Sequence, residues 1–226
     1  MPQRMHALER GSHSRMDAED HGLPFSNRFA LESRPRRIGP LRLRPGRISY
    51  GLCGGMCYAA LDYYHAGVPA PAMVTAPRWG TTMHRYLVRR QLDSWRCLLV
   101  PLRTLCWMAL PDEAVARATL RRQLPRLLAL LKRGEPAVIL LVRVRLGDPT
   151  INHQVVVTGY DYERKGARVR LFLYDPNHRG EVTLDLNACP TDAALEASQS
   201  TGERVRGFFL LPYRPRTRRL PEPDTI

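Results

Sequence analysis

Long apolar runs are missing from this sequence of 226 residues. Its most apolar stretches, residues 97–110 and 137–144, are shorter than the roughly 20 residues that a membrane-spanning helix needs. Pro101 and Arg103 also interrupt the first of them. Residues 1–22 are polar and hold no apolar segment of a secretory signal. We therefore expect a cytoplasmic protein with no membrane partner.

Cysteine is scarce and lysine is nearly absent. Five cysteines are an odd number, and without a visible secretory signal they favour a reducing compartment over a disulfide framework. Cys53 and Cys57 lie one helical turn apart, but no second Cys or His pair stands at zinc-ligand spacing, so we predict no metal and no cofactor. All of the 35 basic residues except Lys132 and Lys165 are arginine.

Basic residues outnumber the 21 acidic ones, which gives a formal net charge of +14. Such a balance is common in proteins that bind nucleic acid or an acidic partner. The arginines are scattered and form no continuous stripe on one predicted helix, so nucleic acid is only weakly supported as a partner. The sequence indicates no oligomeric state.

Composition along the chain predicts one domain over residues 23–213. Residues 1–22 and 214–226 have little to bury and are expected to be flexible tails. Residues 33–47 are rich in Arg and Pro and are expected to be an extended lead-in rather than a regular element.

Helical spacing comes first along the chain and strand patterns follow. Helices are predicted over 53–65, 83–95, 113–123 with Asp112 as the cap, and from Pro125 to Gly134. Strands are predicted over 137–145, 152–162, 168–174, 181–186 and 205–213. This order predicts an α+β fold in which N-terminal helices pack on a C-terminal antiparallel sheet.

The first candidate functional residue is Cys53, at the start of the first long helix. A cysteine there lies at the positive end of the helix dipole, which favours the thiolate. Gly54 and Gly55 follow it directly, and each costs roughly 1 kcal/mol in a helix relative to Ala. We expect them to let a substrate approach the backbone closely. Alternatively, Cys53 only begins the apolar stripe that Cys57 continues.

The second candidate is His153, just before a Val-rich strand. The turn at 163–166 joins this strand to the next one, and pairing their apolar residues matches Val155 with Leu173. The next pair outward in this register is His153 with Asp175. Opposed residues in an antiparallel ladder share a face, so an imidazole is expected beside a carboxylate. An ordinary cross-strand ion pair would give the same pattern.

These residues together predict a cysteine nucleophile with its base. Asp175 would orient the imidazole, and His153 would take the proton of Cys53. If the register slipped by one pair, Asn177 would replace Asp175 on the same face and could serve as the orienting residue.

The motifs resemble the papain-like cysteine peptidase superfamily, in particular the branch that cleaves double-glycine leader peptides and related uncharacterised bacterial proteins. The resemblance rests on Cys53-Gly54 at a helix start, a strand led by His153, and Asp175-Pro176 after the next strand. It spans residues 51 to 177. It implies a papain-like fold and a cysteine hydrolase whose substrates are peptides or acyl compounds.

One position departs from that family. Papain-like enzymes place a Gln a few residues before the nucleophile as a donor to the oxyanion, and residues 47–50 contain no Gln or Asn. The backbone at Cys53 and Gly54 and the side chains of Ser49 and Asn27 are the candidate replacements. Two other functions stay open on sequence alone: an acyltransferase with the same triad, and a catalytically silent module that binds nucleic acid or an acidic partner.

Overall fold

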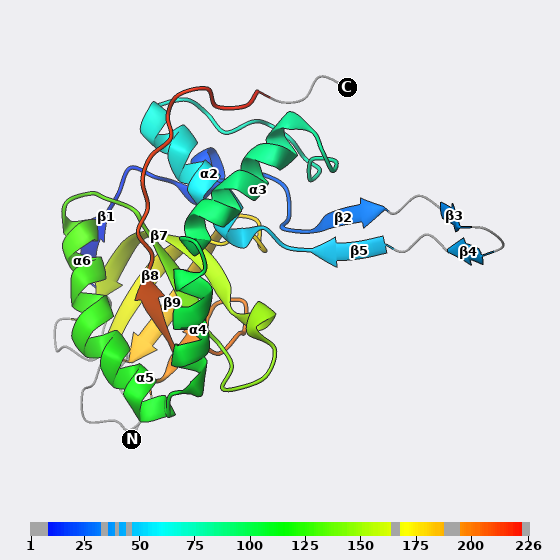
Figure 1. Ribbon diagram of the computed structural model, residues 1–226. Helices are drawn as coiled ribbons and strands as arrows, with labels where there is room; N and C mark the ends of the chain where they lie inside the picture. Colours follow the sequence, from blue (N-terminus) through cyan, green and yellow to red (C-terminus); the bar gives the residue numbers. More distant parts are fainter. Residues whose placement is uncertain are drawn as a thin grey trace.

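The computed structural model describes residues 9–32, 36–38, 41–43, 47–163, 168–187 and 195–222 (Figure 1). Its helical elements are α1 (Ala18–His21), α2 (Cys53–Ala66), α3 (Thr82–Trp95), α4 (Leu99–Ala109), α5 (Asp112–Ala118), the π-helical turn η1 (Thr119–Gln123), α6 (Leu124–Lys132) and the 3-10 turn η2 (Pro149–Ile151). The strands are β1 (Glu9–His13), β2 (Phe29–Glu32), β3 (Arg36–Ile38), β4 (Leu41–Leu43), β5 (Arg47–Tyr50), β6 (Ala137–Val142), β7 (His153–Tyr162), β8 (Arg168–Tyr174), β9 (Glu181–Asn187), β10 (Ala197–Gln199) and β11 (Gly207–Leu210).

The main sheet is antiparallel throughout, with the strand order β10-β9-β8-β7-β6-β11. β1 pairs with the second half of β7, beyond the residues that pair with β6. The protein therefore combines helices with an antiparallel sheet, as the order of sequence patterns predicted for an α+β fold.

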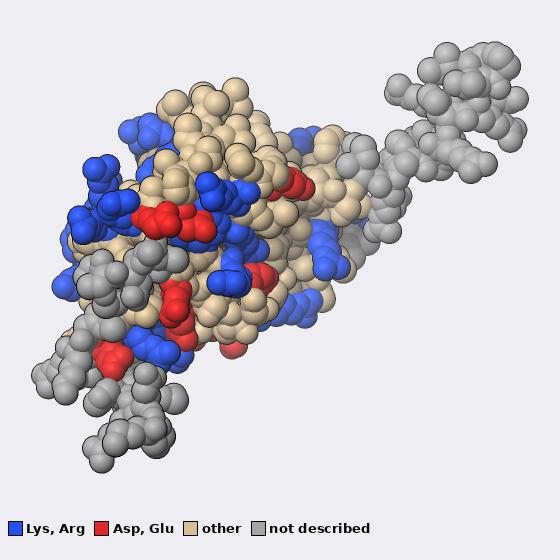
Figure 2. Space-filling model, turned by 90° about the horizontal axis from the view of Figure 1, so that it is seen from below, with Lys and Arg blue, Asp and Glu red and all other residues tan. Residues whose placement is uncertain are grey.

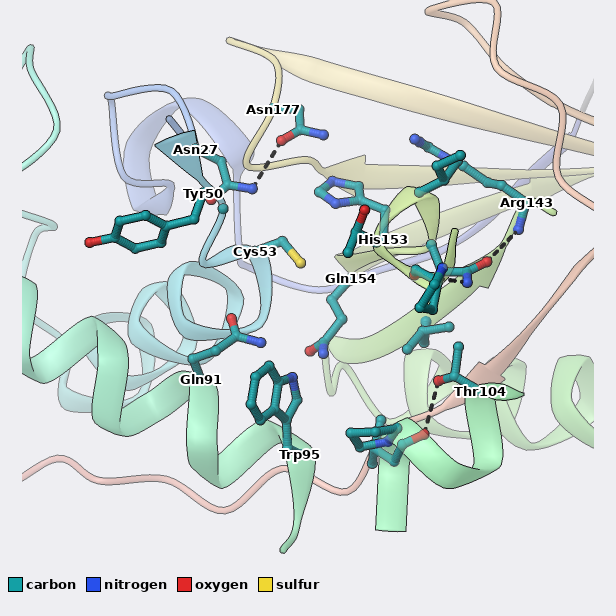
Figure 3. A pocket seen from close by; sticks show the side chains of 18 of the residues that line it. Asn27, Tyr50, Cys53, Gln91, Trp95, Thr104, Arg143, His153, Gln154 and Asn177 are labelled. Carbon is teal, nitrogen blue, oxygen red and sulfur yellow. Dashed lines mark hydrogen bonds between the residues drawn. The ribbon is translucent and has the colours of Figure 1, made fainter. Parts of the chain in front are cut away.

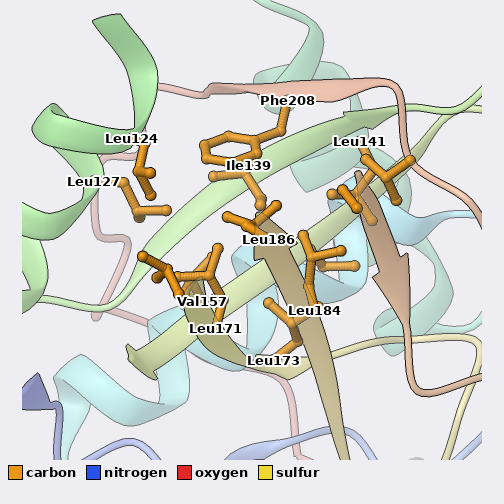
Figure 4. Packing of buried hydrophobic residues seen from close by; sticks show 14 of the residues in the cluster. Leu124, Leu127, Ile139, Leu141, Val157, Leu171, Leu173, Leu184, Leu186 and Phe208 are labelled. Atoms are coloured by element: carbon orange, nitrogen blue, oxygen red, sulfur yellow. The ribbon is translucent and has the colours of Figure 1, made fainter. Parts of the chain in front are cut away.

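Both faces of the sheet are covered, which explains why β6 is buried at every position. Alternate strand residues such as Ile139 and Val157 face α6, where Leu124 and Leu127 meet them (Figure 4). The intervening residues, such as Val156, face α2 and α4. The sheet is thus held between two hydrophobic layers, and the ends of its strands are fixed relative to the start of α2.

Several predicted elements are confirmed. α2 and α3 begin and end within one residue of the expected positions, and Gly67 ends α2 in the left-handed conformation that glycine tolerates. Asp112 is not a cap: it is the first residue of α5, and Pro111 precedes it as the N-cap. α4 was not expected, because its apolar sequence carries no signal for a helix start. The side chain of its N-cap residue, Leu98, makes no capping hydrogen bond.

The expectation of a flexible N-terminal tail is wrong for residues 9–22. These residues form β1, whose pairing with β7 includes Arg10 opposite Asp161, and α1. Met16 and Ala18 are buried against α2. A polar segment can be ordered this way because the neighbouring strand supplies its backbone hydrogen bonds.

The expected C-terminal tail, residues 214–226, is likewise ordered where the structure describes it, up to residue 222. The hydroxyl of Tyr63 donates to the carbonyl of Pro221, and Arg90 donates through Nη2 to the carbonyl of Arg214 at 3.0 Å. Figure 1 shows this segment running past the helices to the top of the molecule. Side chains from α2 and α3 thus hold two carbonyls of this segment.

The segment 33–47 is also not a plain lead-in. Its described parts form β3, β4 and the start of β5, and the β2–β5 pair carries them away from the body of the molecule (Figure 1).

Within the described residues no helix is both long and apolar enough to cross a bilayer. Figure 2 shows charged side chains of both signs beside one another on the face seen from below. An ion pair joins Arg206 to Asp112 at 2.5 Å.

Candidate active site

The start of α2 is held by side chains from distant parts of the chain. The N-cap, Leu52, has no capping side chain of its own, and its N–H donates instead to Oδ1 of Asn27. The N–H of Gly55 donates to Oε1 of Gln91 on α3 at 2.9 Å. These bonds satisfy first-turn amides that have no acceptor within the helix. They fix Cys53, the first residue of α2, at the positive end of the dipole.

The two glycines after Cys53 are explained by packing, so our expectation that they admit a substrate is wrong. A Cβ at Gly55 would lie 2.3 Å from the carbonyl oxygen of Leu87, so this glycine lets α2 and α3 approach closely. A Cβ at Gly54 would lie 2.3 Å from Oγ of Ser94 and 2.4 Å from Oε1 of Gln154. Both glycines are buried, and their neighbours are protein atoms.

His153 and Asp175 meet at the ends of adjacent strands. His153 is the first residue of β7, and Asp175 directly follows the last residue of β8. The Nε2 atom of His153 lies 2.6 Å from Oδ1 of Asp175, and the two residues are 4% and 0% exposed. Since Nε2 is engaged with the carboxylate, Nδ1 is the ring nitrogen left to face Cys53.

The register that predicted this pair was nevertheless wrong by two residues. Leu173 pairs with Val157 rather than with Val155. A bulge at Thr158 then shifts the pairs from Gly159 onward by one more residue. An offset of two keeps every side chain on the same face, so Asp175 stays within diagonal reach of His153.

Asn177, the alternative orienting residue, takes a different role. Its side-chain oxygen accepts from Nδ2 of Asn27 at 3.1 Å, and its backbone N–H donates to Oδ1 of Asp175 at 2.8 Å. The structure thus places Asp175 against the imidazole, and Asn177 supports that carboxylate from the following turn.

The ionisation of the three residues is coupled. Burial raises the pKa of the Cys53 thiol, but the hydrogen bond and charge of His153, with the N–H groups of Gln154 and Gly54, bring it below its usual value. Burial lowers the pKa of His153, yet its bonds to Asp175 and Cys53 raise it to about 9. Burial also opposes ionisation of Asp175, whose bond to His153 lowers its pKa to about 2. These shifts favour a thiolate–imidazolium pair beside a carboxylate.

Cys53 and His153 open into one cavity of about 680 Å³ (Figure 3). Cys53 is partly exposed there, whereas Cys57, one turn further along α2, is buried. Burial and the charges of Cys53 and Asp175 raise the pKa of the Cys57 thiol, which stays neutral. Of the two cysteines in this motif, only Cys53 can meet a ligand.

Asn27 and Ser49, the side chains named as substitutes for the missing Gln, both line this cavity. Asn27 accepts from Leu52, the residue before the nucleophile, so its Nδ2 group is held close to Cys53. Ser49 lies on β5 and is exposed. The N–H of Cys53 lies in the first turn of α2 and has no acceptor within the helix.

Four further residues of the site were missed by sequence reasoning: Gln91, Arg143, Gln154 and Gln199. Gln91 holds the helix start, and Gln154 lies next to Cys53. Only Gln154 carried a signal, its adjacency to His153; the others come from α3, β10 and the loop after β6. Within the described residues no group of three or more His, Cys, Asp or Glu is placed to bind a metal.

No family model, curated protein or solved structure matches this chain in the comparisons. The arrangement of the site therefore carries the functional argument.

Proposed function

We propose that this protein is a cysteine-dependent hydrolase of papain-like architecture, in which Cys53 is the nucleophile. The observation that carries the proposal is the contact between His153 and Asp175, 2.6 Å, beside a partly exposed thiol in one cavity. A nucleophile, its base and an orienting carboxylate in this relation are the parts of a covalent acyl-transfer site.

In the first step the Cys53 thiolate attacks a carbonyl carbon and forms a C–S bond. Negative charge moves to the carbonyl oxygen, and we assign as its donors the N–H of Cys53 and Nδ2 of Asn27, which also donates to Asn177. The C–N or C–O bond to the leaving group then breaks. The leaving group takes the proton of the His153 imidazolium, and the remaining acyl group is a thioester on Cys53.

In the second step water attacks the thioester. Neutral His153 takes a proton from that water, and Asp175 stabilises the imidazolium that forms again. The C–S bond breaks, so that a carboxylic acid leaves and the thiolate–imidazolium pair is restored.

The cavity walls favour a peptide-like or acyl substrate. Its apolar lining is formed by Val100, Pro101, Leu105, Leu140 and Ile151. Gln154 also lines it, paired with Leu140 across the two strands, and its Oε1 is buried without a hydrogen-bond partner among the described residues. Such an oxygen can accept from a substrate N–H, and the apolar residues suit an apolar side chain or acyl group.

The test is alkylation of the intact protein by iodoacetamide across pH, with each modified cysteine identified by mass spectrometry. We expect Cys53 to react at pH 6, well below the pH at which an ordinary thiol with a pKa of about 8.5 reacts. Cys97 and Cys106 are exposed and serve as internal controls for access. His153→Ala should slow the alkylation of Cys53 and leave the alkylation of Cys97 and Cys106 unchanged.

Equal rates for Cys53, Cys97 and Cys106 at pH 6 would reject an activated thiol. A second measurement follows the acyl-enzyme directly. With p-nitrophenyl acetate we expect a burst of one p-nitrophenol per chain that is absent in Cys53→Ala. Absence of the burst in the wild-type protein would reject the thioester.

A further inference from the structure

A buried glutamine lies behind the carboxylate of the site. Gln199 ends β10, is 3% exposed, and donates through Nε2 to Oδ2 of Asp175 at 3.1 Å. The tight turn after β10 holds it in place, because its N–H donates to the carbonyl of Glu203 at 2.9 Å and its carbonyl accepts from Gly202.

The orientation of this amide is set by an arginine. Oε1 of Gln199 accepts from Nη2 of Arg143. A guanidinium can only donate, so the oxygen of Gln199 must face Arg143 and its NH2 group must face Asp175. Had the amide turned over, two donors would meet at Arg143 and two acceptors at Asp175. Each of these buried groups would then lack a partner.

With Gln199 in place both oxygens of Asp175 are engaged. Oδ1 accepts from His153 and from the N–H of Asn177, and Oδ2 accepts from Gln199. Rotation of the carboxylate would break bonds on both sides at once. Loss of Gln199 would leave Oδ2 as a buried, charged oxygen without a donor, which is costly unless the group turns or moves.

We propose that Gln199, held by Arg143, is a positioning residue that keeps Asp175 aligned on His153 and thereby maintains the reactive thiol of Cys53. This inference rests on the proposed function, because it assigns a task within the same site. Gln199 itself touches no reacting atom: it acts through Asp175.

Among the described residues, two further ionisable side chains, Glu203 and His178, lie on the Arg143 side of Gln199. Glu203 lies 3.9 Å from Nη2 of Arg143, and His178 lies 3.5 Å from Glu203. On the side of Asp175 the neighbours that feel its charge are Cys57 and Tyr174, whose pKa values burial raises, so both stay neutral. Arg143 is thus the group that supplies positive charge behind Gln199, and its side chain is only 11% exposed.

The test compares Gln199→Leu with the wild-type protein in the iodoacetamide reaction. Iodoacetamide is small and neutral, so its reaction does not depend on substrate contacts with Arg143, which also lines the cavity. We expect the acidic side of the rate–pH profile of Cys53 to shift to higher pH by about one unit. At a given pH in that range, alkylation is then roughly tenfold slower. The reason is that a misaligned Asp175 stabilises the imidazolium, and hence the thiolate, less well.

The matched control is Gln123→Leu. Gln123 is another buried glutamine, 5% exposed, but its Oε1 accepts from the N–H of Leu210 and it does not contact the triad. We expect this variant to lose stability and keep the wild-type profile. A folded Gln199→Leu protein with an unchanged profile would overturn the inference while leaving the hydrolase proposal intact.

Arg143→Met provides a second route if Gln199→Leu does not fold. Removal of the guanidinium frees the amide of Gln199 to turn over, and we expect a shift in the same direction. An unshifted profile in folded Arg143→Met would also overturn the inference. If wild-type Cys53 shows no reactivity below the usual thiol range, it is the proposed function that fails.

Discussion

The Nε2 atom of His153 lies 2.6 Å from Oδ1 of Asp175, in a position where the carboxylate is completely buried. A buried carboxylate is stable only with partners, and here it has His153, Gln199 and the N–H of Asn177. The site is therefore a structural element as well as a chemical one, and its ionisation affects folding stability.

Replacement of Asp175 should change the acid sensitivity of the fold. The folded-state pKa of Asp175 is lowered to about 2, so the stability that its ionised form contributes is present above the usual pKa near 4 and is lost as pH falls toward 2. The full contribution is on the order of 2 kcal/mol. We expect the stability difference between wild type and Asp175→Asn, measured by urea unfolding, to shrink between pH 5 and pH 2.5.

Asp185→Asn is the control for that measurement. Asp185 pairs with Arg170 at 2.6 Å, but its side chain is 52% exposed, so the pair is screened by solvent. Asp185→Asn should leave the pH dependence of the free energy of unfolding nearly unchanged. A pH-independent effect of Asp175→Asn would contradict an ionised, hydrogen-bonded Asp175.

Asn27 offers a way to separate oxyanion stabilisation from thiol activation. We expect Asn27→Ala to slow the acylation burst with p-nitrophenyl acetate by about 10²–10³-fold, because one donor to the oxyanion is lost. Alkylation by iodoacetamide forms no oxyanion and should change far less. Equal losses in both reactions would show that Asn27 only supports the start of α2 through its bond to Leu52.

Gly55→Ala should destabilise the fold without any effect specific to the thiol. The added methyl group would meet the carbonyl oxygen of Leu87, a backbone atom that moves only if α2 and α3 separate. Overpacking of this kind costs about 1–3 kcal/mol. Gly54→Ala meets the ends of the Ser94 and Gln154 side chains instead, so its cost in urea unfolding should be smaller. The opposite order would reject helix packing as the reason for Gly55.

Asp62 is the centre of a second buried network, which ties the C-terminal segment to α2 and α3. Its carboxylate accepts from Tyr86 at 2.7 Å, from Tyr213 at 2.8 Å and from Arg90 at 3.1 Å. Asp62→Asn should cost about 3–5 kcal/mol, because the buried guanidinium of Arg90 loses the fully buried one of its two carboxylate partners.

Asp93→Asn is the comparison for Asp62. Asp93 also pairs with Arg90, at 2.7 Å, but it is 27% exposed, and a partly exposed pair contributes less. Similar losses for the two variants in urea unfolding would contradict the central role of Asp62.

Local patterns were sufficient for the elements whose signals lie within a few residues. The helix from Cys53 stops at Gly67 for a reason visible in the chain itself, and β8 runs from Arg168 to Tyr174 as its alternation predicts. β1 and β10 were missed because short polar strands gain their hydrogen bonds from neighbours that lie far away in the sequence. α4 was missed because a helix without caps is stabilised by packing alone.

By itself, the sequence determined that Cys53 starts a helix and that His153 and Asp175 share one face of the sheet. The second conclusion survived a wrong register because side chains alternate with a period of two, so an offset of two residues changes the partner but not the face. Only the tertiary structure decided that Gly55 serves helix packing, that Asn27 holds the start of α2, and that Gln199 and Arg143 stand behind Asp175. These contacts join side chains far apart in the chain, and they exist because the packing of helices on the sheet brings their backbones together.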